Sequence, residues 1–274
     1  MMPIEDQSQI GSCTANCLAG AYEYVTKKGN DQDIAVSHLF IYYNGRAKEN
    51  PSAITDSGCT MTNSIETLEE FGVCLKSIWP YDISQMNTKP NGEAYQDAKG
   101  HKIIDALQVD IDLTEMKSCL AQGFPFAFGL KLFPSFDKAG KTGVVPMPNS
   151  TDESRQSDSS HALLAVGYSD RSQSFIVRNS WGEDWYVSID YKIQSCFKFD
   201  FPVLNTIFFF HIPDPLENTS LTLFEVAFNG QENDLRDLLI HRLAYVDVWD
   251  SHGLAALHFA TYIVYINVID ILLN

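Results

Sequence analysis

Apolar residues recur at helical spacing directly after residue 12. They lie three or four positions apart, which places them on one face of an α-helix: Cys13, Cys17, Leu18, Ala21, Tyr24 and Val25. Ser12 is suited to cap this helix, and Gly29 lies just after the last apolar position. A second helix is expected over residues 65–71, with Asn63 as its cap and Gly72 at its end. Helices therefore dominate the first hundred residues.

The pattern changes after residue 109 to short apolar runs between loops rich in Gly, Pro and Ser, which is typical of strands. The runs are FPFAFGL, HALLAVGY, SFIVRNSWG and VLNTIFFFHI. A polar turn at residues 169–173 joins the second and third runs and predicts a hairpin. An antiparallel return of that length would bring Asn179 back beside His161. A helical half thus precedes a β half, which indicates the α+β class.

Composition narrows the possible functions. With 274 residues and 45% apolar content, the chain can bury a substantial core, in one large domain or two smaller ones. The net charge is −16 and no Lys/Arg cluster occurs, which argues against nucleic-acid binding. No stretch is long and apolar enough for a membrane span, and the start MMPIEDQS lacks the features of a signal peptide. We therefore expect a cytoplasmic protein.

Cysteine spacing predicts neither a metal site nor a cofactor. The six cysteines include no pair of CxxC motifs, and the histidines form no HExxH motif. The even number of cysteines permits disulfides, but without an export signal we expect reduced thiols.

Cys13, His161 and Asn179 are the residues whose chemistry is most informative. Cys13 lies in a first helical turn, where backbone N–H groups and the helix dipole favour a thiolate and lower a thiol pKa. His161 follows roughly 150 residues later and Asn179 soon after it, the order of a thiol nucleophile, a general base and a group that orients the base. The plain alternatives are that Cys13 is a buried core residue and that His161 is structural. For Cys17, one turn later, we favour the core.

The chain resembles the papain-like cysteine peptidase family over residues 4–212. The match rests on Gln7 six positions before Cys13, on GSC, on HALLAVGY and on RNSWGEDW. The resemblance implies a two-lobe fold, with a helical lobe and an antiparallel β lobe in residues 1–212, and hydrolysis of peptides through an acyl-enzyme. It further implies that Cys13 is the nucleophile, His161 its base, Asn179 the orienting amide and Gln7 a side-chain donor of the oxyanion hole.

Four further residues are expected around the substrate. Gly11 leaves room for substrate and backbone, and Ser12 is placed with it. Gly58, in DSGC, resembles the glycine segment that pairs with extended substrate backbone, although an ordinary turn glycine is an equal alternative. Trp181 would shield the Asn179–His161 hydrogen bond from water, or simply pack in the core.

The segment 216–274 has a different periodicity, which predicts an all-α domain of about two ankyrin-like repeats. A shift of 33 residues, the ankyrin length, aligns the segment with itself and pairs Phe224 with Leu257 and Ala227 with Ala260. The motif DSHGLAALHFA resembles the ankyrin turn and helix start, whereas a generic pair of amphipathic helices is the alternative. Such repeats would bind a protein partner. Because they are stable only when stacked, either the peptidase half caps the array or further repeats are missing.

Ile10 stands where secreted relatives carry a disulfide cysteine, so the chain is similar to the disulfide-poor microbial branch of the family, and this supports reduced thiols. Two other departures keep other functions open: few residues precede Cys13, and the segment after Trp185 is hard to align. The first alternative is therefore a catalytically impaired binding scaffold. The second is an acyltransferase that uses the same Cys–His pair, against which the NSWG motif favours a peptidase.

Overall fold

The fold was analysed in a computed structural model, which describes residues 4–30, 32–109, 111–132, 143–145, 160–182, 186–190 and 207–211, with positions 136, 139, 232, 233 and 236. The chain divides into two compact units, residues 1–28 with 32–212 and residues 29–31 with 213–274. The predicted ankyrin-like repeats fall almost entirely outside the described residues. In the described part, no helix is both long and apolar enough to cross a membrane.

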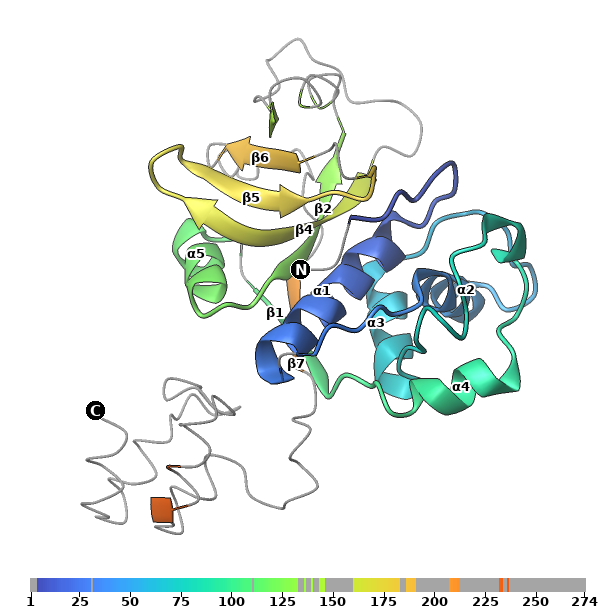
Figure 1. The fold of residues 1–274 in the computed structure, drawn as a ribbon. Coiled ribbons are helices and arrows are strands. Elements are labelled where there is room, and N and C mark those ends of the chain that lie inside the picture. The colour runs from blue at the N-terminus through green and yellow to red at the C-terminus, as the bar shows by residue number, and fades with distance from the viewer. Residues whose placement is uncertain are drawn as a thin grey trace. The chain divides into compact units, whose positions relative to one another are not determined.

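Helices are the main regular structure of the first hundred residues, as the sequence predicts (Figure 1). They are α1 (Cys13–Asn30), α2 (His38–Glu49), α3 (Met61–Glu70), the 3-10 turn η1 (Ile83–Gln85), α4 (Gly92–Ala98) and, in the second half, α5 (Leu113–Ala121). The periodicity analysis did not predict α2, α4 or α5. The helix α5 corrects the expectation of strands alone after residue 109, and its start is marked by Asp112, which accepts the N–H groups of Thr114 and Glu115.

Two helix boundaries differ from the prediction. The helix α3 starts at Met61 rather than at residue 65, because the Thr60 hydroxyl caps it by accepting the N–H of Asn63. Gly72 does follow its end, with φ at +81°, and a Cβ there would lie 1.9 Å from the Ala98 carbonyl oxygen. Gly29 lies inside the last turn of α1 rather than beyond it.

The second half of the first unit forms one twisted sheet. Its strands are β1 (Asp105–Gln108), β2 (Phe126–Lys131), β3 (Val144–Val145), β4 (Ser160–Ser169), β5 (Ser174–Arg178), β6 (Tyr186–Asp190) and β7 (Ile207–His211). The order across the sheet is β1-β7-β2-β4-β5-β6-β3. Every neighbouring pair is antiparallel, as the sequence predicts, except the two-residue β3 with β6, which is parallel.

The predicted hairpin is the pair β4 and β5. Ser169 lies opposite Ser174 and Leu164 opposite Arg178, so the chain leaving β5 returns to the first residues of β4. A bulge between Ala165 and Gly167 shifts the register within the pair.

The helix α1 packs against the other helices and also against the sheet. Leu18 is fully buried among the helices, whereas the thiol of Cys17 donates to the Leu163 carbonyl oxygen on β4 at 3.0 Å. Cys17 is thus the core residue that the sequence predicts. Gly20 faces the same strands, since a Cβ there would lie at an ordinary contact distance, 3.4 Å, from Arg178 Nε. The start of α1 therefore lies against β4, beside the chain that leaves β5.

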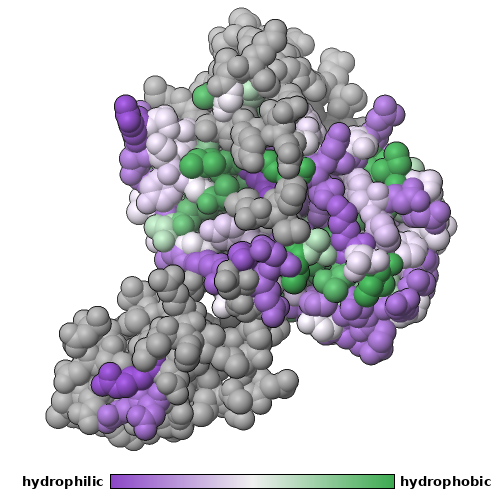
Figure 2. All heavy atoms as spheres, viewed as in Figure 1, coloured by the Kyte–Doolittle hydropathy of each residue, from purple (hydrophilic) through white to green (hydrophobic). Residues whose placement is uncertain are grey.

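The viewed surface is predominantly polar over the helical part, with apolar side chains in small separate groups (Figure 2). Among the described residues, the large apolar side chains exposed by more than a third are Ile83, Ile104, Leu107, Ile111, Val144 and Ile176. Isolated exposed apolar side chains are normal on globular proteins.

Candidate functional site

Cys13 is the first residue of α1. The Ser12 carbonyl accepts the N–H of Asn16 at 3.0 Å, so the helix hydrogen bonds begin at Ser12. The Ser12 side chain is fully buried, and its hydroxyl lies 2.7 Å from that of Tyr81. The contacts of the Ser12 side chain thus point into the protein, and its expected place beside the substrate stays a prediction.

The Cys13 thiol is partly exposed and lies against β4. Burial raises its pKa, while hydrogen bonds from the backbone N–H groups of Ala162 and Thr14 oppose the rise. The sequence predicts a lowered thiol pKa from the helix end alone. In the fold, burial of the thiol has the larger effect, so the neutral thiol is favoured.

His161 and Asn179 are hydrogen-bonded where the hairpin brings them together. His161 Nε2 lies 2.6 Å from Asn179 Oδ1, and both residues are buried. Asn179 Oδ1 also accepts the Ser180 N–H at 2.8 Å, which fixes the oxygen of the amide toward the imidazole. Burial lowers the pKa of His161, and the bond to Asn179 opposes that change. The neutral imidazole is therefore favoured, with Nδ1 left as its other nitrogen.

Two aromatic rings enclose the imidazole of His161. Trp181 stacks on it with centroids 4.9 Å apart and an interplanar angle of 27°. Phe136 meets His161 edge to face at 6.1 Å and Trp181 at 5.4 Å. Trp181 also packs, partly buried, against the apolar core cluster of the sheet. No local motif in the sequence marks Phe136 as part of this site.

Gln7 is fixed at both ends of its side chain. Its backbone N–H donates to the Ser180 carbonyl at 2.8 Å, and the Ser180 hydroxyl donates to its Oε1. One N–H of Nε2 donates to the Ile10 carbonyl at 3.0 Å. Since an amide nitrogen carries two protons, the other N–H remains for an acceptor outside this turn.

Gly11 and Gly58 approach each other closely. A Cβ on Gly11 would lie 3.1 Å from Gly58 N, and Gly58 has φ at +74°. The Gly11 N–H donates to Asp56 Oδ1 at 2.8 Å, and the Gly58 N–H donates to the Tyr42 hydroxyl at 3.3 Å. The structure thus brings Gly58 beside the Gly11–Cys13 segment. Gly11 leaves room for the Gly58 backbone, and Gly58 adopts a positive φ that favours glycine.

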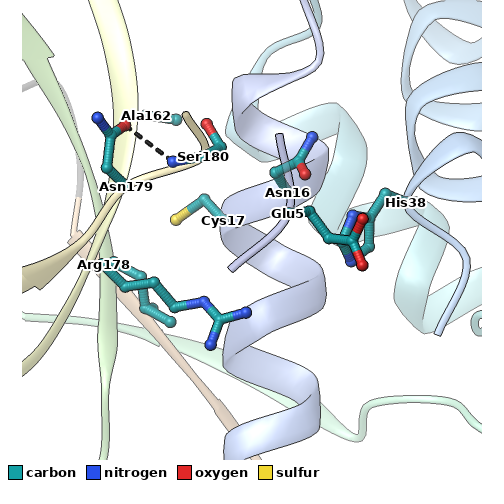
Figure 3. A pocket seen from close by; sticks show the side chains of 9 residues that line it. Glu5, Asn16, Cys17, His38, Ala162, Arg178, Asn179 and Ser180 are labelled. Atoms are coloured by element: carbon teal, nitrogen blue, oxygen red, sulfur yellow. Dashed lines mark hydrogen bonds between the residues drawn. The ribbon is translucent and has the colours of Figure 1, made fainter. Parts of the chain in front are cut away.

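A small polar cavity lies behind this site (Figure 3). Its volume of about 10 Å³ has room for one water molecule, and its lining includes Asn16, Cys17 and His38. Asn16 Oδ1 and His38 Nδ1 are buried without a protein partner. The size and the buried lining exclude this cavity as a peptide-binding site.

Comparisons with known proteins show the family of this chain. The model of the papain family of cysteine proteases matches residues 1–196. The chain is 40% identical over 202 residues to the uncharacterized peptidase C1-like protein L477 of Acanthamoeba polyphaga mimivirus, covering 68% of this chain and 64% of the viral one. It is 28% identical over 193 residues to cathepsin K of Gallus gallus, covering 67% and 52%. The chain thus spans about half to two thirds of these relatives.

Solved structures show the same fold. Xylellain, a cysteine protease from Xylella fastidiosa, is 32% identical with a TM-score of 0.66, covering 77% of this chain and 83% of xylellain. The Carica candamarcensis cysteine protease CMS1MS2, solved in complex with E-64, is 18% identical with a TM-score of 0.56, covering 77% and 93%. The predicted papain-like combination of helices and an antiparallel sheet is confirmed for the described part of residues 1–212.

Proposed function

Because the chain belongs to the papain family of cysteine proteases, we propose that it hydrolyses peptide bonds with Cys13 as nucleophile, His161 as general base and acid, and Asn179 as the orienting amide. The observation that carries this proposal is the 2.6 Å hydrogen bond between buried His161 and Asn179 beside the strand that Cys13 contacts. The substrate is a peptide or protein.

The proton moves together with the attack. Desolvation favours the neutral thiol and the neutral imidazole, so the pair holds one proton before the substrate binds. His161 takes the proton from Cys13 as the sulfur attacks the carbonyl carbon, and a tetrahedral intermediate forms. His161 then gives the proton to the leaving amine, which departs and leaves a thioester. Water, deprotonated by His161, hydrolyses the thioester and restores the thiol.

Gln7 and the Cys13 backbone stabilise the charge that develops on the carbonyl oxygen. The remaining N–H of Gln7 Nε2 and the Cys13 N–H act as the two donors. The hydrogen bonds of Gln7 to Ser180 and Ile10 support this role, because donors already fixed in place need no reorganisation during the reaction.

Asn179 and Trp181 keep His161 in the productive orientation. The bond from His161 Nε2 to Asn179 leaves Nδ1 to exchange the proton, and the Trp181 ring limits rotation of the imidazole. Gly11 and Gly58 form a wall without side chains, against which extended substrate backbone can lie.

For residues 216–274 we keep the proposal of ankyrin-like repeats that recruit a protein partner. It is supported by the 33-residue self-similarity of the sequence.

The experiment that tests the proposed function is labelling with E-64, the compound that the Carica candamarcensis protease holds in its complex. We expect the epoxide to modify Cys13, as identified by mass spectrometry of the labelled peptide, and peptide hydrolysis to stop with it. Cys17→Ala is the matched control, since Cys17 is a buried core thiol on the same helix and its loss should leave labelling intact. Labelling of another cysteine, or hydrolysis that survives Cys13→Ala, would contradict the proposal.

A further inference from the structure

We propose that Asp56 is a positioning residue that fixes the Gly11 turn, and with it both donors of the oxyanion hole, against the Gly58 wall. This inference rests on the proposed function of Cys13 and Gln7. Asp56 belongs to none of the motifs of the sequence analysis, and its side chain acts through backbone groups rather than on the substrate.

One carboxylate oxygen joins two separate parts of the chain. Asp56 Oδ1 accepts the Gly11 N–H at 2.8 Å and also accepts the hydroxyl of Tyr42. The Tyr42 oxygen in turn accepts the Gly58 N–H at 3.3 Å. A chain of hydrogen bonds therefore runs from Gly58 through Tyr42 and Asp56 to Gly11.

The direction of this hydrogen-bond chain is fixed. Burial and the bond to Asp56 raise the pKa of Tyr42, so its hydroxyl remains a donor across the pH range in which proteins fold. Because Tyr42 donates to Asp56, its lone pairs are available to the Gly58 N–H.

Buried Arg46 supports the whole arrangement. It is 2% exposed, and its guanidinium lies 3.7 Å from the centroid of the Tyr42 ring. Its Nη1 donates to the carbonyl of Thr55, the residue before Asp56, at 2.6 Å. The same guanidinium thus holds both the donor and the acceptor of the Tyr42–Asp56 bond in place.

Gly11 transmits this position to the reacting groups. The residue before it, Ile10, accepts the Nε2–H of Gln7, and Cys13 follows two residues after it. The side chain of Ile10 is buried and apolar, so it makes no hydrogen bond that could hold the turn. The hydrogen bonds that hold the turn therefore come from backbone groups beside it, such as the Gly11 N–H. If the Gly11 N–H loses its acceptor, the turn can move, and a displacement of about 1 Å costs on the order of 10²-fold in rate.

The test compares variants at Asp56 with a matched variant at Asp112. Asp112 is also exposed, and its Oδ1 also accepts two hydrogen bonds, but it caps α5 away from Cys13. For Asp56→Ala we expect kcat for a peptide substrate to fall about 10- to 100-fold with a smaller change in KM. Asp56→Asn keeps an acceptor oxygen and should restore kcat to within about threefold of wild type. Asp112→Ala should leave kcat unchanged.

Tyr42→Phe provides a second comparison, because it removes the hydroxyl but leaves the Gly11–Asp56 bond. Its kcat should fall less than that of Asp56→Ala. The positioning role would be overturned if Asp56→Ala kept the kcat of the wild type, or if Asp56→Asn did not restore the kcat that Asp56→Ala loses. It would also be overturned if Asp112→Ala or Tyr42→Phe lost as much kcat as Asp56→Ala. If the wild-type protein neither hydrolyses peptides nor reacts with E-64, the proposed function itself is overturned. This result distinguishes failure of the proposed function from failure of the role of Asp56 alone.

Discussion

The two flanks of Cys13 are built in different ways. On the sheet flank, His161 and Asn179 are 18 residues apart and belong to one hairpin, and aromatic rings enclose them. On the helical flank, Gly11 and Asp56 are 45 residues apart, and polar bonds to backbone groups join them. The hydrogen-bonded pair of the first flank therefore lies within one short stretch of sequence. The second flank depends on segments that only the folded helices bring together.

The largest expected effect comes from removing the centre of the sheet flank. His161→Ala should lower kcat/KM for a peptide substrate by about 10⁴-fold, because the thiol then has no group to take its proton. The control is His101→Ala, since that histidine is partly exposed and pairs with Asp97 on the helical side. Retention of more than about a tenth of the activity in His161→Ala would contradict the assignment of the base.

The next effect tests whether the two flanks meet at the oxyanion hole. Gln7→Ala removes a proposed donor and should lower kcat about 10²–10³-fold with little change in KM. Steady-state kinetics measure both constants, and Gln122→Ala, an exposed glutamine after α5, is the control. A raised KM with unchanged kcat would show instead that Gln7 binds substrate and transition state equally.

A smaller effect is expected when the sheet flank loses its orienting amide. Asn179→Ala should lower kcat about 10- to 100-fold, less than His161→Ala, because the imidazole still samples the productive orientation part of the time. Labelling of Cys13 by E-64 should persist at a reduced rate. If Asn179→Ala behaves as wild type in both assays while His161→Ala is inactive, Asn179 does not orient the histidine.

The pH profile sharpens the same prediction. The pair is active with one proton, so activity should rise as the doubly protonated form loses a proton and fall as the last proton is lost. Since the pKa of His161 is lowered and that of Cys13 is raised, the acid limb should lie below the usual range of a histidine and the alkaline limb above the usual range of a cysteine. The bond to Asn179 raises the pKa of His161, so Asn179→Ala should move the acid limb to lower pH. A shift to higher pH would contradict this cause.

The smallest effect concerns the aromatic cover. Trp181→Phe keeps a ring over His161 but reduces its area, so kcat should fall only a few-fold, about two- to tenfold. Trp79→Phe is the matched control and should leave kcat unchanged, because Trp79 packs against the buried core of the helices. Equal losses in both variants would indicate a general packing defect instead of a role at His161.

Several parts of the fold could be predicted from local sequence. The hairpin of β4 and β5 follows from two apolar runs and a polar turn, and the structure places Ser169 opposite Ser174 as that pattern requires. The start of α1 at Cys13 follows from helical spacing alone. By contrast, the sequence pattern did not predict α2. Because α2 is buried on most sides, its apolar residues form a run without a helical period.

Only the tertiary structure decided the electrostatics and the support of the site. The sequence by itself determined that Cys13 begins a helix, that His161 and Asn179 share a hairpin and that Gln7 lies close before the thiol, because each follows from neighbours in the chain. It could not give the raised thiol pKa, which comes from burial of the thiol in the folded protein, nor the contacts of Phe136 and Asp56. Burial and hydrogen bonds between distant segments depend on how the helices and the sheet pack, and no local pattern of residues encodes them.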